Sequence, residues 1–176
     1  PEDGLGKADA QPNHINGQVL LCDGLPAKHA KLHVYMPSPS SIDASITTDA
    51  DGRFDFIVRI LPTALVQLQF TATSQDEQQL AFHRFAWEQS ERVTEGIEIQ
   101  LEPQRTVEIE VVDPQHSPVE NAHVALQFRN PYVLTGFETD ESGKVSFNLP
   151  ASERIGSVVA WKDNLGLDYR LYSLPR

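Results

Sequence analysis

The sequence predicts an all-β protein made of two consecutive Greek-key β-sandwiches. Apolar and polar residues alternate along most of the chain, as in Ala30, Leu32, Val34 and Met36, and this is the period of a half-buried strand. The 12 prolines and 10 glycines separate these segments, as expected at turns. The first half also recurs in the second after about 90 residues, the size of a small domain rather than of a solenoid repeat.

Five residues of each half carry this repeat. The matching pairs lie 92 or 91 positions apart: Pro26 with Pro118, Ala30 with Ala122, Thr48 with Thr139, Gly52 with Gly143, and Phe56 with Phe147. In both copies a Thr-Asp-x-x-Gly turn precedes an alternating apolar segment, and Gly supplies the positive φ that such a turn needs.

The alternation predicts about seven strands in the first copy and six in the second. In the first copy they are Ile15–Cys22, Ala30–Met36, Ile42–Thr48, Phe54–Ile60, Leu65–Thr73, Leu80–Trp87 and Thr94–Leu101. In the second copy they lie near residues 106–112, 122–128, 133–139, 144–149, 155–162 and 166–173.

These strands predict a flexible lead-in over residues 1–13, a first sandwich over 14–103 and a second over 104–176. The second has no counterpart of Thr94–Leu101. Either the fold tolerates six strands, or the sequence stops early, or a partner fills the open edge by adding a strand. Since the chain begins at Pro1 and its only Met is Met36, we expect it to be a piece of a longer protein.

Charge and composition exclude several classes of partner. The net charge of −11, from 25 acidic and 14 basic residues, disfavours nucleic acid and anionic membranes. No apolar run approaches the roughly 18 residues that a membrane span requires. Cys22 is the only cysteine, so no disulfide can form within the chain, and we expect it to be a small buried residue.

The combined pattern resembles the carboxypeptidase regulatory-like domain. It consists of a strand, Asp-x-x-x-Pro-Val-x-x-Ala-x-Val, a loop, and then Thr-Asp-x-x-Gly-x-Phe-x-Phe; residues 15–102 match it most fully, and 105–176 match it with His116-Ser117-Pro118 in place of Gly-x-Pro. The resemblance implies a prealbumin/immunoglobulin-like sandwich related to collagen-adhesin B-type modules. It also implies an extracytoplasmic location, in the periplasm or at the cell surface of a bacterium.

Chemistry found on related folds lacks its residues here. Intradiol dioxygenases share the turn but hold iron with two Tyr and two His, and this chain has no His-x-His pair. The last strand of the first copy has no Asn for a Lys–Asn isopeptide bond. His29 and His33, expected in one strand, would lie about 13 Å apart, too far to share zinc. We therefore expect no cofactor and no enzymatic activity.

Asp49, Asp51 and Asp55 form an acidic cluster that remains a weak calcium candidate. Calcium takes about six or more oxygen ligands, and a tight turn offers fewer. Turn chemistry also accounts for Asp at these positions without a metal.

Aromatic residues are the remaining candidate contacts with a protein or a sugar: Phe85, Trp87, Trp161, Tyr169 and Tyr172. Core packing is the simpler explanation, since a sandwich needs core aromatics, but the same residue types anchor interfaces. We expect a noncatalytic spacer or interaction module that binds other domains of the parent protein or another protein. The alternative is a carbohydrate-binding accessory module that contacts polysaccharide through exposed aromatics.

Overall fold

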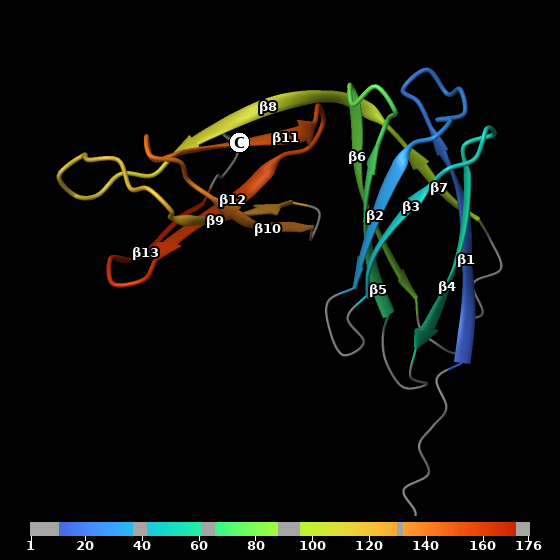
Figure 1. Ribbon diagram of the computed structural model, residues 1–176, viewed down its shortest axis with the longest axis horizontal. Coiled ribbons are helices and arrows are strands. Elements are labelled where there is room, and N and C mark those ends of the chain that lie inside the picture. The colour runs from blue at the N-terminus through green and yellow to red at the C-terminus, as the bar shows by residue number, and fades with distance from the viewer. Residues whose placement is uncertain (1–10, 37–41, 61–65, 88–95, 130–131, 172–176) are drawn as a thin grey trace, which may run out of the picture. The chain divides into compact units, whose positions relative to one another are not determined.

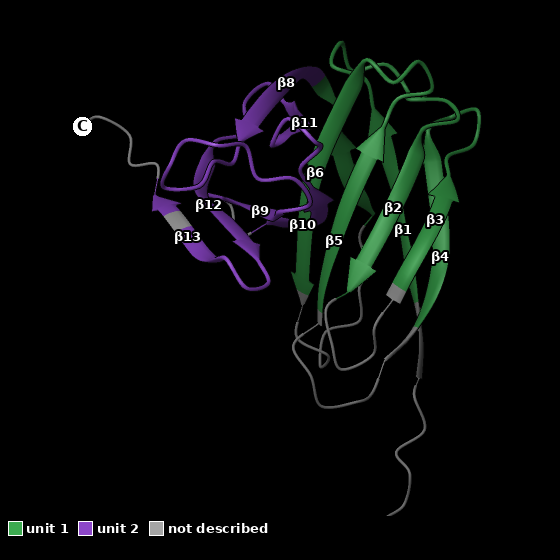
Figure 2. Cartoon of the chain, turned by 60° about the vertical axis from the view of Figure 1, so that its left-hand side comes forward, with its two compact units in different colours: residues 1–102 green, residues 103–176 purple. Residues whose placement is uncertain are grey.

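A computed structural model describes residues 11–36, 42–60, 66–87, 96–129 and 132–171. The described residues form 13 strands and no helix, so the predicted all-β class is confirmed (Figure 1). In particular, no helix in these ranges is long and apolar enough to cross a membrane. The chain divides into two compact units, residues 1–102 and 103–176 (Figure 2).

The first unit is a sandwich of two sheets. One sheet has the order β4-β1-β7, and the strands of the other follow the order β3-β2-β5-β6. Their bounds are β1 Gln11–Leu20, β2 Lys31–Met36, β3 Ile42–Thr47, β4 Arg53–Ile60, β5 Val66–Thr73, β6 Gln79–Trp87 and β7 Ile97–Gln100. The pairing of β7 with β1 is parallel, whereas the other strand pairs of this unit are antiparallel.

The core of the first unit lies between these sheets and follows the predicted alternation. In β2 the inward side chains of Leu32, Val34 and Met36 are at most 3% exposed, while their neighbours are exposed. Phe54 of β4 packs against Phe70 of β5, with ring centroids 6.0 Å apart. Aromatic and branched residues from both sheets therefore close one core.

The second unit also has two sheets. One follows the order β10-β9-β12-β13, and the other pairs β8 with β11. Their bounds are β8 Glu102–Glu110, β9 His123–Phe128, β10 Val133–Glu138, β11 Lys144–Pro150, β12 Ile155–Lys162 and β13 Gly166–Leu171. The core contains Leu126 and Phe147, and the Phe147 ring lies 4.6 Å from that of Phe137.

The turns before β4 and β11 require glycine. Gly52 and Gly143 have φ of 71° and 75°, in the left-handed region. A Cβ on Gly52 would lie 2.5 Å from the Val19 carbonyl oxygen, and one on Gly143 would lie 2.7 Å from that of Val111. The repeated Thr-Asp-x-x-Gly pattern thus marks a backbone contact that only glycine permits in both units.

Three expectations need correction. Residues 11–13 are not part of a lead-in, because they pair with residues 58–60 as the start of β1. Cys22 is exposed rather than buried, because β1 ends at Leu20 and Cys22 lies in the following turn. His29 also lies in a turn, with a φ of 53°, so it does not share a strand with His33.

Candidate interaction surface of the second unit

The five aromatic candidates divide between the two units. Phe85, in β6, is partly buried and packs against the core of the first unit. Trp87 ends the same strand, but its side chain lies outside the described part of the structure. In the second unit the backbone of Tyr169 pairs with Val159 in the β12–β13 hairpin, and the description covers neither the side chain of Tyr169 nor Tyr172.

Trp161 is the aromatic candidate that lines a cavity. It is half-buried in β12, and its ring stacks on the imidazole of His123, with centroids 5.3 Å apart. The same imidazole lies 3.2 Å from the Glu138 carboxylate. These contacts place the Trp161 ring, stacked on His123, at the wall of the cavity.

The cavity has a volume of about 440 Å³ and is a groove between the end of β8 and the β12–β13 hairpin. Its apolar lining includes Val111, Val112, Val119, Trp161, Leu165 and Leu167. Three of these are exposed: Val112 at 43%, Leu165 at 65% and Leu167 at 70%. Large apolar side chains grouped beside a cavity are typical of a binding surface, whereas isolated ones are common everywhere.

Charged groups border this groove without converging in it. The Lys162 ammonium donates a hydrogen bond to the Glu120 carbonyl at 2.6 Å. The Arg170 guanidinium lies 3.5 Å from the Asp168 carboxylate, and both are largely exposed. These groups are engaged with surface partners, so the groove favours an apolar ligand with a polar rim around it.

The acidic residues proposed as a weak calcium site make local contacts within or next to their turn. One carboxylate oxygen of Asp49 accepts hydrogen bonds from the backbone N–H groups of Asp51 and Arg53 at 2.9 and 2.8 Å. Asp55 instead lies 3.7 Å from the His14 ring. Among the described residues, no group of three or more His, Cys, Asp or Glu side chains is placed to hold a metal ion.

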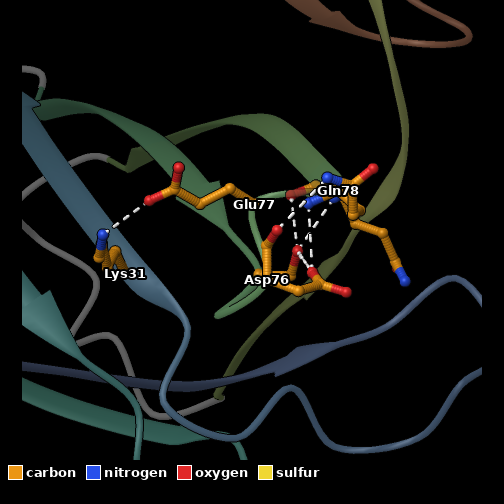
Figure 3. A network of polar contacts seen from close by, with 6 residues as sticks. Lys31, Asp76, Glu77 and Gln78 are labelled. Carbon is orange, nitrogen blue, oxygen red and sulfur yellow. Dashed lines mark hydrogen bonds and ion pairs between the residues drawn. The ribbon is translucent and has the colours of Figure 1, made fainter.

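A polar network in the first unit has the same local character (Figure 3). Lys31 lies 2.9 Å from Glu77, and the hydroxyl of Ser74 donates to the Asp76 carboxylate at 2.6 Å. The Ser74 hydroxyl and the N–H of Gln78 lower the pKa of Asp76 by stabilising its charged form. This network fixes the β5–β6 turn.

The corresponding β12–β13 turn of the second unit differs in kind. The first copy reads Ser74-Gln-Asp-Glu-Gln-Gln79 there, whereas the second reads Asp163-Asn-Leu-Gly-Leu167. Sequence reasoning missed Leu165 and Leu167, yet the presence of two leucines where the first copy has only polar residues was visible in the repeat.

No protein-family model matches the chain, and no curated protein matches it. Solved structures with some similarity include the Bacillus anthracis TIE protein, 16% identical with a TM-score of 0.36, covering 91% of this chain and 31% of that one. A streptococcal ancillary pilin is 8% identical with a TM-score of 0.39, covering 93% and 59%. Catechol 1,2-dioxygenase from an Acinetobacter species is 13% identical with a TM-score of 0.37, covering 64% and 48%. The chain spans less than two thirds of each of these neighbours, and likeness at this level carries no argument about activity.

Proposed function

We propose that this chain is a noncatalytic interaction module of a larger bacterial extracytoplasmic protein, and that the groove of the second unit binds a protein partner. The two sandwiches, of carboxypeptidase regulatory-like type, act as a spacer that presents this surface. One observation carries the proposal: Val112, Leu165 and Leu167 are exposed beside a groove of about 440 Å³, and the two leucines lie where the first unit has a polar turn.

The proposal has an energetic reason: these side chains are exposed to water in the isolated chain and would be removed from it when a partner binds. Each large apolar side chain removed from water contributes roughly 1.5–3 kcal/mol before the costs of binding are counted. Trp161 adds a rigid aromatic wall, a residue type enriched among the strong contacts of interfaces. The polysaccharide alternative has less support, because Phe85 packs into the core and only Trp161 of the described aromatic candidates lines the groove.

Site-specific photo-crosslinking tests this function. A benzophenone amino acid is placed at Leu167, 70% exposed in the groove, and in a matched control at Ile57, 57% exposed on the first unit. Both variants are made in the cells that produce the protein, and the adducts are identified from their peptides.

We expect a defined polypeptide adduct from position 167, absent from position 57 and reduced by Leu165→Ser. Equal labelling at both positions, or no adduct at 167, would contradict the proposal. A glycan adduct at 167 would favour the polysaccharide alternative instead.

A further inference from the structure

The first unit contains a strand, β7, that has no counterpart among the described residues of the second unit. β7 runs parallel to β1, so that Gly17 faces Ile97 and Leu20 faces Gln100. It buries Ile97, Ile99 and the following Leu101 at 5%, 1% and 0% exposure. The Leu101 N–H also donates to the Leu20 carbonyl at 2.8 Å. β7 therefore supplies both core side chains and backbone pairing to the edge of β1.

The second unit repeats the neighbours of β7. Ile109 pairs with Val145 in the β8–β11 ladder, as Gly17 pairs with Phe54 in the β1–β4 ladder. After β13, however, the described part of the second unit contains no further strand. Val19 is fully buried in the first unit, whereas the matching Val111 is only partly buried. β7 pairs with residues 17–20, which match residues 109–112 of the second unit. The groove that Val111 and Val112 line therefore lies where a counterpart of β7 would pair.

We propose that this groove receives an extended segment of a partner protein, which runs parallel to the end of β8 and inserts two alternating apolar side chains. The inference rests on the proposed interaction function and specifies the form of the partner. β7 is the template: the inserted residues would take the places of Ile99 and Leu101. Strand addition of this kind combines backbone hydrogen bonds, which give affinity, with pockets for alternate side chains, which give specificity.

The two units differ at one position of this edge, and the difference limits the register in which an inserted strand can pair with β8. A Cβ on Gly17 would collide with the carbonyl oxygen of Ile97 and would lie 2.6 Å from the ring of Phe54. The second unit has Ile109 at that position. A partner strand therefore cannot copy the place of Ile97, and its pairing must begin opposite Glu110. Two inserted apolar residues follow from this restriction, instead of the three of the first unit.

The surface beside the groove favours a separate protein as the donor. Leu165 and Leu167 are 65% and 70% exposed next to it, whereas the corresponding turn of the first unit, Ser74–Gln79, is polar. A partner protein that brings further surface along with its strand would cover these two leucines.

The first test is a titration of the whole chain, labelled with ¹⁵N, by a peptide of the sequence of residues 98–102, Glu-Ile-Gln-Leu-Glu. A control peptide carries Asp at the two apolar positions. We expect shifts at the amides of residues 109–112 and at the Trp161 indole with the first peptide only. Residues 17–20 are the internal control, because β7 already pairs with them.

A second measurement tethers the strand to the chain, because a peptide of five residues binds weakly on its own. The same five residues are appended after Arg176 through about twelve Gly/Ser residues, which gives an effective concentration in the millimolar range. We expect a higher denaturant midpoint for the second unit than with the Asp-containing tail.

If the apolar and Asp forms behave alike in both measurements, strand insertion is wrong. The crosslinking at Leu167 is independent of this result, because any protein bound at the groove would be captured. If position 167 gives an adduct but the peptides have no effect, the proposed protein-binding function is supported and only the insertion of a strand is contradicted.

Discussion

The hydroxyl of Thr48 accepts a hydrogen bond from the backbone N–H of Ala30 at 2.8 Å. The same hydroxyl donates to the carbonyl of Ala27 at 2.6 Å, and the Thr48 side chain is 2% exposed. In the second unit Thr139 makes the two matching bonds, with the N–H of Ala122 at 2.9 Å and the carbonyl of Val119 at 2.6 Å. One buried hydroxyl thus ties the turn before β2 or β9 to the end of β3 or β10.

Thr48→Val should destabilise the first unit by roughly 2 kcal/mol, because a donor and an acceptor of the backbone would remain buried without a partner. Thr48→Ser keeps the hydroxyl and should cost less. Denaturant unfolding of both variants measures the difference, and Thr139→Val should have the same effect on the second unit. A smaller loss from the Val variant than from the Ser variant would show that the methyl group, which Val keeps and Ser lacks, and not the hydrogen bonds, carries the contribution.

His116→Gly should stabilise the second unit by up to about 1 kcal/mol. His116 has a φ of 63°, and Gly24, at the matching place in the first unit, has a φ of 83°. A residue with a side chain is strained in the left-handed region, so glycine relieves strain in the folded state. Part of this stabilisation is offset because glycine has greater conformational freedom in the unfolded chain. Thermal unfolding should show the opposite sign for Gly24→His. A lower midpoint for His116→Gly would mean that the imidazole has contacts that outweigh the strain.

The strands were predictable because one face of each is buried and the other is in water. In β2 and β4 a period of two was enough to locate core residues such as Val34 and Phe54. The end of β1 was not predictable in this way, because Val19, Leu20, Leu21 and Cys22 contain no polar residue to mark it. Alternation identifies the buried face of a strand but not the residue at which the strand ends. That residue is set by the turn, which here places Cys22 in solvent.

The candidate surface was only partly predictable. Trp161 was named from its residue type, but the parallel pairing of β7 with β1 comes from a long crossover that leaves no local pattern. No pattern within either copy marks the groove, because it depends on how strands from distant parts of the chain are arranged. Leu165, in the β12–β13 turn, and Leu167, at the start of β13, line it because this hairpin lies beside the end of β8.

Lowering the pH from 7 to 5 should reduce the stability of the first unit in part through His83. This side chain lies in β6 against the ring of Phe70, with centroids 6.2 Å apart, and burial lowers the pKa of the imidazole below 6.5. Below pH 6.5 the unfolded chain then binds more protons than the folded one, so stability falls with pH through this window until the folded pKa is passed.

Urea midpoints at pH 7 and 5 test this dependence. His83→Gln should lose less stability than the parent between these values, and the difference between the two proteins should be constant above pH 7. The lowered carboxylate pKa values of Asp76 and Asp140 act below about pH 4, outside the window. The same slope in both proteins would exclude His83 as a source of the pH dependence.

The double substitution Ile109→Gly with Val145→Phe should convert the groove of the second unit into a closer copy of the β7 slot. It restores the pair formed by Gly17 and Phe54 and removes the side chain that blocks the place of Ile97. A peptide of the sequence of residues 96–102 could then bury a third apolar side chain, worth roughly 1.5–3 kcal/mol, or about tenfold or more in affinity.

Calorimetric or NMR titration of the parent and the double variant measures this gain. The shorter peptide of residues 98–102 is the control, because it lacks the third apolar residue and should bind both proteins alike. Ile109→Gly alone should be less stable than the double variant, since it leaves a cavity that the phenylalanine ring would fill. If the longer peptide gains nothing from the double substitution, Ile109 does not set the register, and the groove does not correspond to the position of β7.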